Sequence, residues 1–184
     1  VDVRGRGGSD GAFTPHEGLS SDGCETIGWI KTQPWSNGQV VMQGSSYSGM
    51  VQWKIAAKCA DKLAAIVPSA AAYSGVDFPS FENQITAPYV ARWLALVAGR
   101  SKNFEQLDDD DFWQKKHREL FLSQKPFHQY DDMLGLRSPY FDLWIDQLGD
   151  ASLPLWASDN PSQEEMAKID IPILSIALIS SVAY

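Results

Sequence analysis

The hydrophobic positions of the chain form three short apolar runs, with longer stretches of helical spacing between them. The runs are residues 39–43, 63–67 and 171–177, and each has the length of a buried strand. Residues 50–60, between the first two runs, carry apolar side chains at helical spacing. Strand, turn, helix and strand in this order predict a βαβ unit, with the first strand in the centre of a parallel sheet and covered on both faces. Pro68 is expected to end the second strand.

Another helix is predicted upstream of the βαβ unit. Ser21 or Asp22 can cap its N-terminus, and its apolar positions include Ile27 and Ile30. It should stop before Pro34, because a residue that precedes proline is disfavoured in a helix. The following residues, 35–38, read Trp-Ser-Asn-Gly and predict a turn.

From residue 78 to about 166 the sequence is rich in aromatic residues and has helical spacing, and no strand-like run interrupts it. The acidic run 108–111 precedes lysines and an arginine, which suits the dipole of a helix and needs no ligand. We therefore predict an α/β fold interrupted by a helical cap. The predicted parts are a core at 1–76, a helical cap insertion at 77–166 and a return strand at 167–184. Prolines divide the cap into pieces, at Pro88, Pro126, Pro139 and Pro154.

Composition excludes several functions. The net charge is −8 and no basic stripe is present, which argues against binding to nucleic acid. The longest apolar stretch, residues 171–179, is about half the length of a membrane-spanning helix, and no secretory signal pattern is present. Cys24 and Cys59 are too few for a zinc site, and free structural thiols are favoured over a single bridge between neighbouring helices. We expect neither a metal nor a cofactor.

The candidate chemistry lies where the first predicted strand meets the helix. Ser46 stands between Gly44 and Gly49, and a serine between a buried strand and a helix, with small residues around it, predicts a nucleophile elbow. The general pattern is G-x-S-x-G, whereas here the second glycine comes one residue later. A polar turn without chemistry is the alternative, and Ser45 and Ser48 are weaker candidates because neither lies two residues after a strand-ending glycine.

In such an elbow the serine attacks a carbonyl carbon, a histidine accepts its proton and an aspartate orients the histidine. The backbone N–H of Tyr47, at the start of the helix, would stabilise the oxyanion. Only His16, His117 and His128 could serve as a base within this chain, and we expect all three to be surface or packing residues. Asp77 or Asp108 would satisfy the required chain order formally, without further support.

With these residues in view, the chain resembles the X-Pro dipeptidyl-peptidase-like hydrolases, a group that includes CocE-type acyl esterases and α-amino-acid ester hydrolases. Residues 2–11 are similar to that family's D-x-R-G-x-G-x-S-x-G loop, and residues 33–38 to the turn before its nucleophile strand. Residues 44–49, Gly-Ser-Ser-Tyr-Ser-Gly, match the family's own G-x-S-Y-x-G pattern. Residues 65–69 are similar to the strand that follows, and the similarity weakens toward residue 177.

The resemblance implies that Ser46 is the nucleophile and that Tyr47 supplies one oxyanion-hole N–H. It implies a small ester or short peptide as substrate and no cofactor. In the family the triad aspartate and histidine follow the return strand, but here no Asp or Glu follows Asp170 and no His follows His128. The second oxyanion donor of the family, a tyrosine before the D-x-R-G segment, also has no counterpart. The chain opens on Val1 as if at a strand end, so we interpret it as a fragment of low solubility, with a silent remnant as the alternative.

The aromatic residues of the predicted cap allow two interpretations. They could line a pocket for an apolar acyl group or a proline ring, but their spacing favours a helical core. The residues concerned are Trp93, Phe112, Trp113, Phe121, Phe127, Tyr130, Tyr140, Phe141, Trp144 and Trp156.

Overall fold

The structure is a computed structural model that describes residues 2–73, 80–81, 84–85, 87–97, 109–135, 141 and 159–177. The chain divides into two compact units, considered separately below. The first unit comprises Val1–Pro15, Pro79–Gly149 and Ala183–Tyr184, and the second comprises His16–Phe78 and Asp150–Val182. The domain boundaries that the sequence suggests, after residues 76 and 166, stay a prediction.

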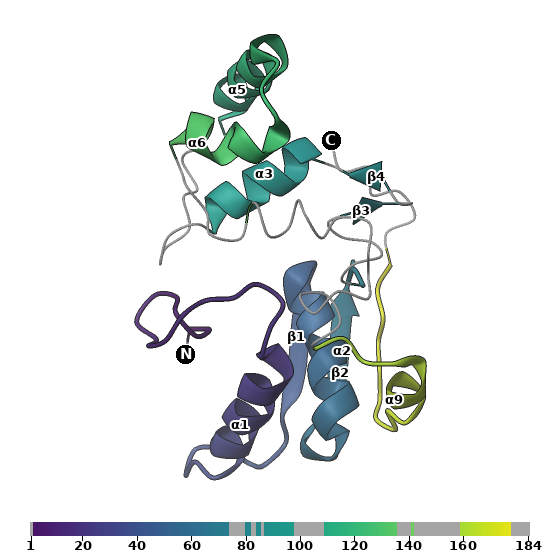
Figure 1. The fold of residues 1–184 in the computed structure, drawn as a ribbon. Helices are drawn as coiled ribbons and strands as arrows, with labels where there is room; N and C mark the ends of the chain where they lie inside the picture. The colour runs from purple at the N-terminus through teal and green to yellow at the C-terminus, as the bar shows by residue number, and fades with distance from the viewer. Residues whose placement is uncertain are drawn as a thin grey trace. The chain divides into compact units, whose positions relative to one another are not determined.

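The second unit is a βαβ arrangement with flanking helices (Figure 1). Strands β1 and β2 are parallel, with Val41 opposite Ala65 and Ser45 opposite Ser69. Helix α2 connects them, which confirms the predicted order. The elements of this unit are α1 (Leu19–Lys31), β1 (Val41–Ser45), α2 (Tyr47–Cys59), the 3₁₀ helix η1 (Ala60–Lys62), β2 (Ala65–Ser69) and α9 (Gln163–Ala167).

The third apolar run lies beside β2. Parallel bridges join Ile66 to Ile173 and Ser69 to Ile176, so β2 has β1 on one side and this segment on the other. The predicted return of the chain to a parallel sheet is therefore confirmed. Strand β2 also passes through Pro68, which was expected to end it. The carbonyl of Pro68 accepts a hydrogen bond of 2.9 Å from the N–H of Ile176, so the strand loses one donor and continues.

One face of this sheet carries the core of the second unit. Buried side chains of α1 and α2 pack there, and partly buried Met42 and Trp53 border them. The prediction that both faces are covered is wrong for the described residues. Val41 is 56% exposed, and Leu174 in the third run is 61% exposed. The buried members of this core are Cys24, Ile27, Ile55, Ala56, Cys59, Leu63 and Ile66.

Helix α1 begins earlier than its sequence suggested. Its N-cap is Gly18, with φ 67°, instead of Ser21 or Asp22. The backbone N–H of Ser20 donates a 3.0 Å hydrogen bond to the Asp159 carboxylate, and the Ser20 hydroxyl donates to the same group. A carboxylate 139 residues away thus accepts a hydrogen bond from a backbone N–H of the first turn of the helix. No local sequence pattern reveals such a partner. The C-terminus, at Lys31, is where the sequence placed it.

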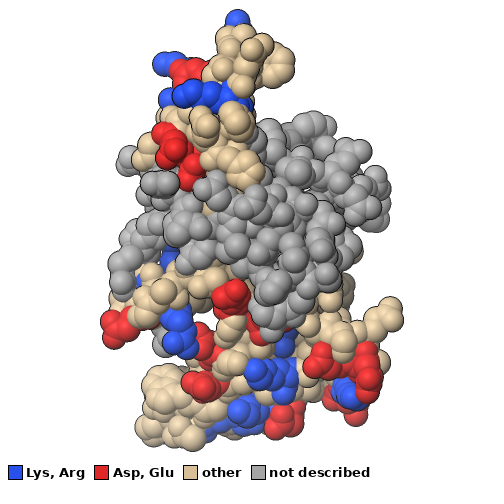
Figure 2. Space-filling model, in the orientation of Figure 1, with Lys and Arg blue, Asp and Glu red and all other residues tan. Residues whose placement is uncertain are grey.

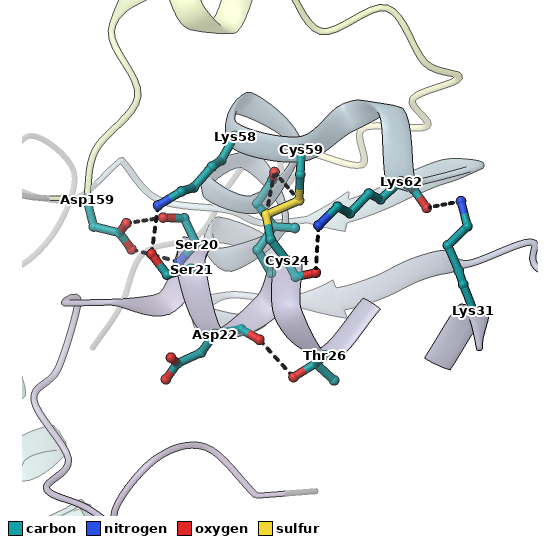
Figure 3. The surroundings of a disulfide bond; sticks show 11 residues. Ser20, Ser21, Asp22, Cys24, Thr26, Lys31, Lys58, Cys59, Lys62 and Asp159 are labelled. Atoms are coloured by element: carbon teal, nitrogen blue, oxygen red, sulfur yellow. Dashed lines mark hydrogen bonds between the residues drawn. A yellow bond between two sulfur atoms is a disulfide. The ribbon is translucent and has the colours of Figure 1, made fainter. Parts of the chain in front are cut away.

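A disulfide joins Cys24 of α1 to Cys59 at the end of α2 (Figure 3). The two Cα atoms are 6.1 Å apart, within the usual range for such a bridge. The prediction of free thiols is therefore wrong, and the alternative of one bridge between neighbouring helices is what the structure contains. Two further contacts between the same helical segments flank the bridge. The Lys58 ammonium donates to the Ser21 hydroxyl at 2.7 Å, and the Lys62 ammonium to the Cys24 carbonyl at 3.4 Å.

The first unit contains the helices of the expected cap. Its described elements also include a short antiparallel pair, β3 and β4, whereas we predicted no strand there. Two-residue strands are too short to produce an alternating pattern. The elements are β3 (Ser80–Phe81), β4 (Gln84–Ile85), α3 (Ala87–Leu96), α5 (Asp110–Ser123), η2 (Phe127–Gln129) and α6 (Tyr130–Leu134).

The acidic run of the first unit has the structural role predicted for it, as far as it is described. Asp109 caps α5, and its carboxylate accepts a 2.9 Å hydrogen bond from the N–H of Phe112. Asp110 forms an ion pair of 2.9 Å with Arg92. The contacts need no ligand, which agrees with the interpretation of these acids as a helix start.

The aromatic residues of the first unit form a core in part. Trp113, Tyr130 and Phe141 are buried, and the His117 ring lies 5.9 Å from that of Trp113 and 5.6 Å from that of Tyr130. Phe121 is 83% exposed, so the core prediction is wrong there. Trp93 and Phe112 are partly buried. Four more candidates lie outside the described residues, by their side chain or entirely: Phe127, Tyr140, Trp144 and Trp156.

On the face drawn in Figure 2, acidic and basic side chains of the described residues are intermingled. None of the helices in the described ranges is both long enough and apolar enough to cross a membrane.

Candidate active site at the strand–helix turn

Ser46 occupies the turn between β1 and α2 in a conformation that is rare for its residue type. Its φ is 56° and its ψ is −121°, and it is exposed. A positive φ is costly for a residue with a Cβ and persists only where surrounding contacts enforce it. Those contacts are present. The N–H of Ser46 donates to the Ser69 carbonyl at 2.9 Å, and the Ser46 carbonyl accepts from Gly49 and Met50, both at 2.9 Å.

The two glycines around Ser46 are required by close packing. A Cβ on Gly44 would lie 2.6 Å from the Cβ of Ser48, and a Cβ on Gly49 would lie 2.8 Å from the carbonyl oxygen of Ser69. Both distances are shorter than side chains tolerate. The late second glycine thus faces the end of β2, which gives the G-x-S-x-x-G spacing a physical reason.

Gln52 holds the turn together, a role that the sequence analysis did not assign to it. Its side chain is fully buried, with 0% exposure, one turn beyond Ser48 on α2. Its amide nitrogen donates to the carbonyls of Gly44 at 3.3 Å and Ser48 at 3.0 Å, and its amide oxygen accepts from the N–H of Val67 at 3.0 Å. One side chain therefore links β1, α2 and β2 below Ser46. Glutamine inside an apolar stretch was the only available signal.

The side chain of Tyr47 contacts His16, in the segment before α1. Its hydroxyl accepts a 3.3 Å hydrogen bond from the backbone N–H of His16, and the two rings meet edge to face with centroids 5.3 Å apart. Burial raises the pKa of the Tyr47 phenol to about 12, so the ring stays neutral at physiological pH. The ring fixes the first residue of α2, whose backbone N–H is the predicted oxyanion donor. That donor role stays a prediction.

His16 is buried beneath this turn and has the packing role expected of it. It is 1% exposed, has φ 70°, and its carbonyl accepts a 3.3 Å hydrogen bond from the Lys54 ammonium. Burial, together with the charge of Lys54, lowers the pKa of His16 to about 3, so its ring is neutral. His117 packs among aromatic rings, and burial lowers its pKa as well. His128 is exposed.

The glycine-rich segment of residues 2–11 belongs to the first unit and closes on itself. The Asp2 carboxylate accepts from the N–H of Gly8 at 3.1 Å, and the Ser9 hydroxyl donates to the Asp2 carbonyl at 2.6 Å. The Arg6 guanidinium donates to the Val97 carbonyl at 2.6 Å. Asp2 is a loop residue here, so the strand end expected at the start of the chain is wrong for the described residues.

Comparisons with known proteins show sequence and fold similarity to hydrolases. The X-Pro dipeptidyl-peptidase (S15 family) sequence model matches residues 1–178. Cocaine esterase from Rhodococcus sp. (strain MB1 Bresler) is 42% identical over 98 residues, which are 52% of this chain and 17% of that protein. An aminopeptidase from a marine sediment Thaumarchaeota archaeon superposes with a TM-score of 0.63 at 20% identity, over 96% of this chain and 31% of its own. The chain thus spans less than a third of either protein, and the structural likeness supports the fold.

Proposed function

The chain belongs to the X-Pro dipeptidyl-peptidase (S15) family of hydrolases, and on that premise we propose that it carries the nucleophile turn of a serine hydrolase. The hydrolase would cleave ester or amide bonds through an acyl-enzyme on Ser46. The observation that carries this proposal is the strained, exposed conformation of Ser46 between a parallel strand and a helix, with φ 56°. Strain of this kind in a strand–turn–helix setting is typical of a nucleophile elbow.

Two features of the geometry support this proposal. The Ser46 hydroxyl stands exposed at the carboxyl end of β1, where ligands bind in parallel α/β sheets. When it attacks a carbonyl carbon, the negative charge moves to the carbonyl oxygen. The backbone N–H of Tyr47, at the positive end of α2, is the group that we assign to that oxygen.

Deprotonation of Ser46 needs a base, and none is assigned within this chain. His16 is buried and its low pKa makes it a poor proton acceptor, and the His117 ring packs against the rings of Trp113 and Tyr130. Because no base is assigned to Ser46, we keep a second candidate, a catalytically silent member of the family. A serine without its base retains only about 10³ to 10⁴-fold acceleration over water in related triads.

Labelling with a fluorophosphonate probe tests the proposal and separates the two candidates. An activated Ser46 is labelled in the wild type and in Ser48→Ala, a matched control in the same turn, and is unlabelled in Ser46→Ala. Mass spectrometry of the labelled peptide locates the adduct on Ser46. Equal labelling of wild type and Ser46→Ala would contradict a nucleophilic Ser46. Absence of labelling in a folded wild-type chain would support the silent candidate.

A further inference from the structure

A pocket of about 140 Å³ lies beside α2 in the second unit. Its walls are mainly apolar, and its volume is close to that of engineered protein cavities that bind benzene. Three parts of the chain form it, namely one face of α2, the residues after β2, and residues that precede or belong to α9. The lining residues are Met50, Trp53, Lys54, Ala71, Ala72, Tyr73, Asn160, Pro161 and Met166.

Lys54 is the one cationic side chain in this lining. It is only 3% exposed, which is unusual for lysine. Its ammonium donates a hydrogen bond of 3.3 Å to a neutral acceptor, the His16 carbonyl, and makes no ion pair with the carboxylates that the structure describes. The charge of Asp159 acts on Lys54, but the carboxylate oxygens of Asp159 already accept from Ser20.

A buried ammonium with one neutral partner is energetically unfavourable, because water no longer solvates it. Burial accordingly lowers the pKa of Lys54 to about 8. The ammonium still predominates at neutral pH, so the cavity wall holds a charge that lacks a direct counter-ion among the described residues. An anion that entered the pocket would complete a buried ion pair, and apolar walls would bury the rest of it.

We propose that this pocket is a binding site for a small organic carboxylate, with its apolar body against Met50, Trp53 and Met166 and its carboxylate on the Lys54 ammonium. The single buried cation fits one negative charge better than a phosphate, which requires several donors. The size fits a single aromatic ring. The site requires no reaction at Ser46, so its test is independent of the proposed hydrolase function.

Benzoate and benzamide, which have nearly the same shape, are suitable probes for the full chain. We expect benzoate to bind at least tenfold more tightly than benzamide by isothermal titration calorimetry. Lys54→Met keeps the length of the side chain and removes the charge, so it should weaken benzoate binding at least tenfold. Lys58→Met is the matched control, because Lys58 lies one turn further along α2 and its ammonium contacts Ser21 instead. Its benzoate affinity should equal that of the wild type.

A second variant keeps the test decisive if Lys54→Met does not fold. Ala72→Leu fills the pocket from another wall and leaves the charge in place, so it should abolish binding of benzoate and benzamide alike. The proposal is overturned if benzoate binds no better than benzamide to the wild type. It is equally overturned if folded Lys54→Met, or Ala72→Leu, binds benzoate as the wild type does.

Discussion

The side-chain oxygen of Gln52 accepts a hydrogen bond of 3.0 Å from the backbone N–H of Val67. Val67 lies opposite Gln43 in the parallel register of β1 and β2, which continues to Ser45 opposite Ser69 before the chain turns at Ser46. The same Gln52 amide donates to the Gly44 carbonyl at the end of β1. A side chain of α2 thus links the end of β1 to β2, two residues before the strained Ser46.

Gln52→Met should destabilise the second unit, because it leaves the Val67 N–H and the Gly44 carbonyl without their buried partner. The expected loss is about 1 to 3 kcal/mol in the free energy of unfolding. Urea denaturation followed by circular dichroism measures it. Gln39→Met, at an exposed position before β1, is the control and should change stability by less than about 0.5 kcal/mol. Equal stability of the two variants would show that the Gln52 bonds contribute little.

Gly49→Ala should disturb the turn itself. The new Cβ would lie 2.8 Å from the Ser69 carbonyl and 3.1 Å from the Cβ of Ala71, so backbone must move. We expect a loss of about 1 to 3 kcal/mol, as for overpacked cores, together with reduced fluorophosphonate labelling of Ser46. Gly28→Ala is the matched control in α1, where a Cβ meets only the far end of Lys62 at 3.9 Å. It should stabilise the protein by about 0.5 to 1 kcal/mol, since alanine is the better helix former. If Gly49→Ala stabilised the protein, the close approach of residue 49 to the Ser69 carbonyl would be refuted.

The features that sequence reasoning found are local, and those that it missed depend on distant residues. Ser46 is recognisable because Gly44, the apolar run before it and the helix after it are neighbours in sequence. The start of α1 was misplaced because its acceptor, Asp159, is 139 residues away. Gln52 was missed because its side chain bonds to Gly44 of β1 and Val67 of β2 as well as to its own helix. The apolar content of residues 39–43 also cannot show that Val41 is exposed. An apolar sequence indicates which side chains are suited to burial, and whether another element covers them depends on the rest of the fold.

The Cys24–Cys59 bridge should contribute about 2 to 4 kcal/mol to stability, because it restricts the unfolded chain across a separation of 35 residues. Thermal unfolding with and without a reductant measures this. The wild type should melt at a lower temperature in the reductant, whereas the double variant Cys24→Ser with Cys59→Ser should melt at one temperature in both conditions. A wild type that reacts with a maleimide under native, non-reducing conditions would contradict the bridge.

Acid should destabilise the second unit through His16. Its pKa is about 3 in the folded chain, against 6.5 for an unperturbed histidine, so between these values the unfolded chain binds a proton that the folded chain excludes. The free energy of unfolding should therefore fall as the pH drops below 6.5, by up to about 1.4 kcal/mol per pH unit. Lys54 of α2 adds to the effect by charge repulsion, and the Tyr47 ring faces the imidazole without a charge.

His16→Asn tests this assignment, because asparagine tolerates the positive φ of 70° and does not titrate in this range. Urea unfolding at pH 7.5, 6.0 and 5.0 measures how the free energy of unfolding depends on pH. Below pH 6.5 this dependence should be weaker than in the wild type by the amount that corresponds to about one bound proton. Some slope should remain, since burial and Arg92 also lower the pKa of His117 in the other unit. Gln39→Met, which changes an exposed position without a titratable side chain, is the control and should keep the wild-type slope. If His16→Asn kept it as well, the acid sensitivity would have to come from a group other than the buried imidazole beneath Ser46.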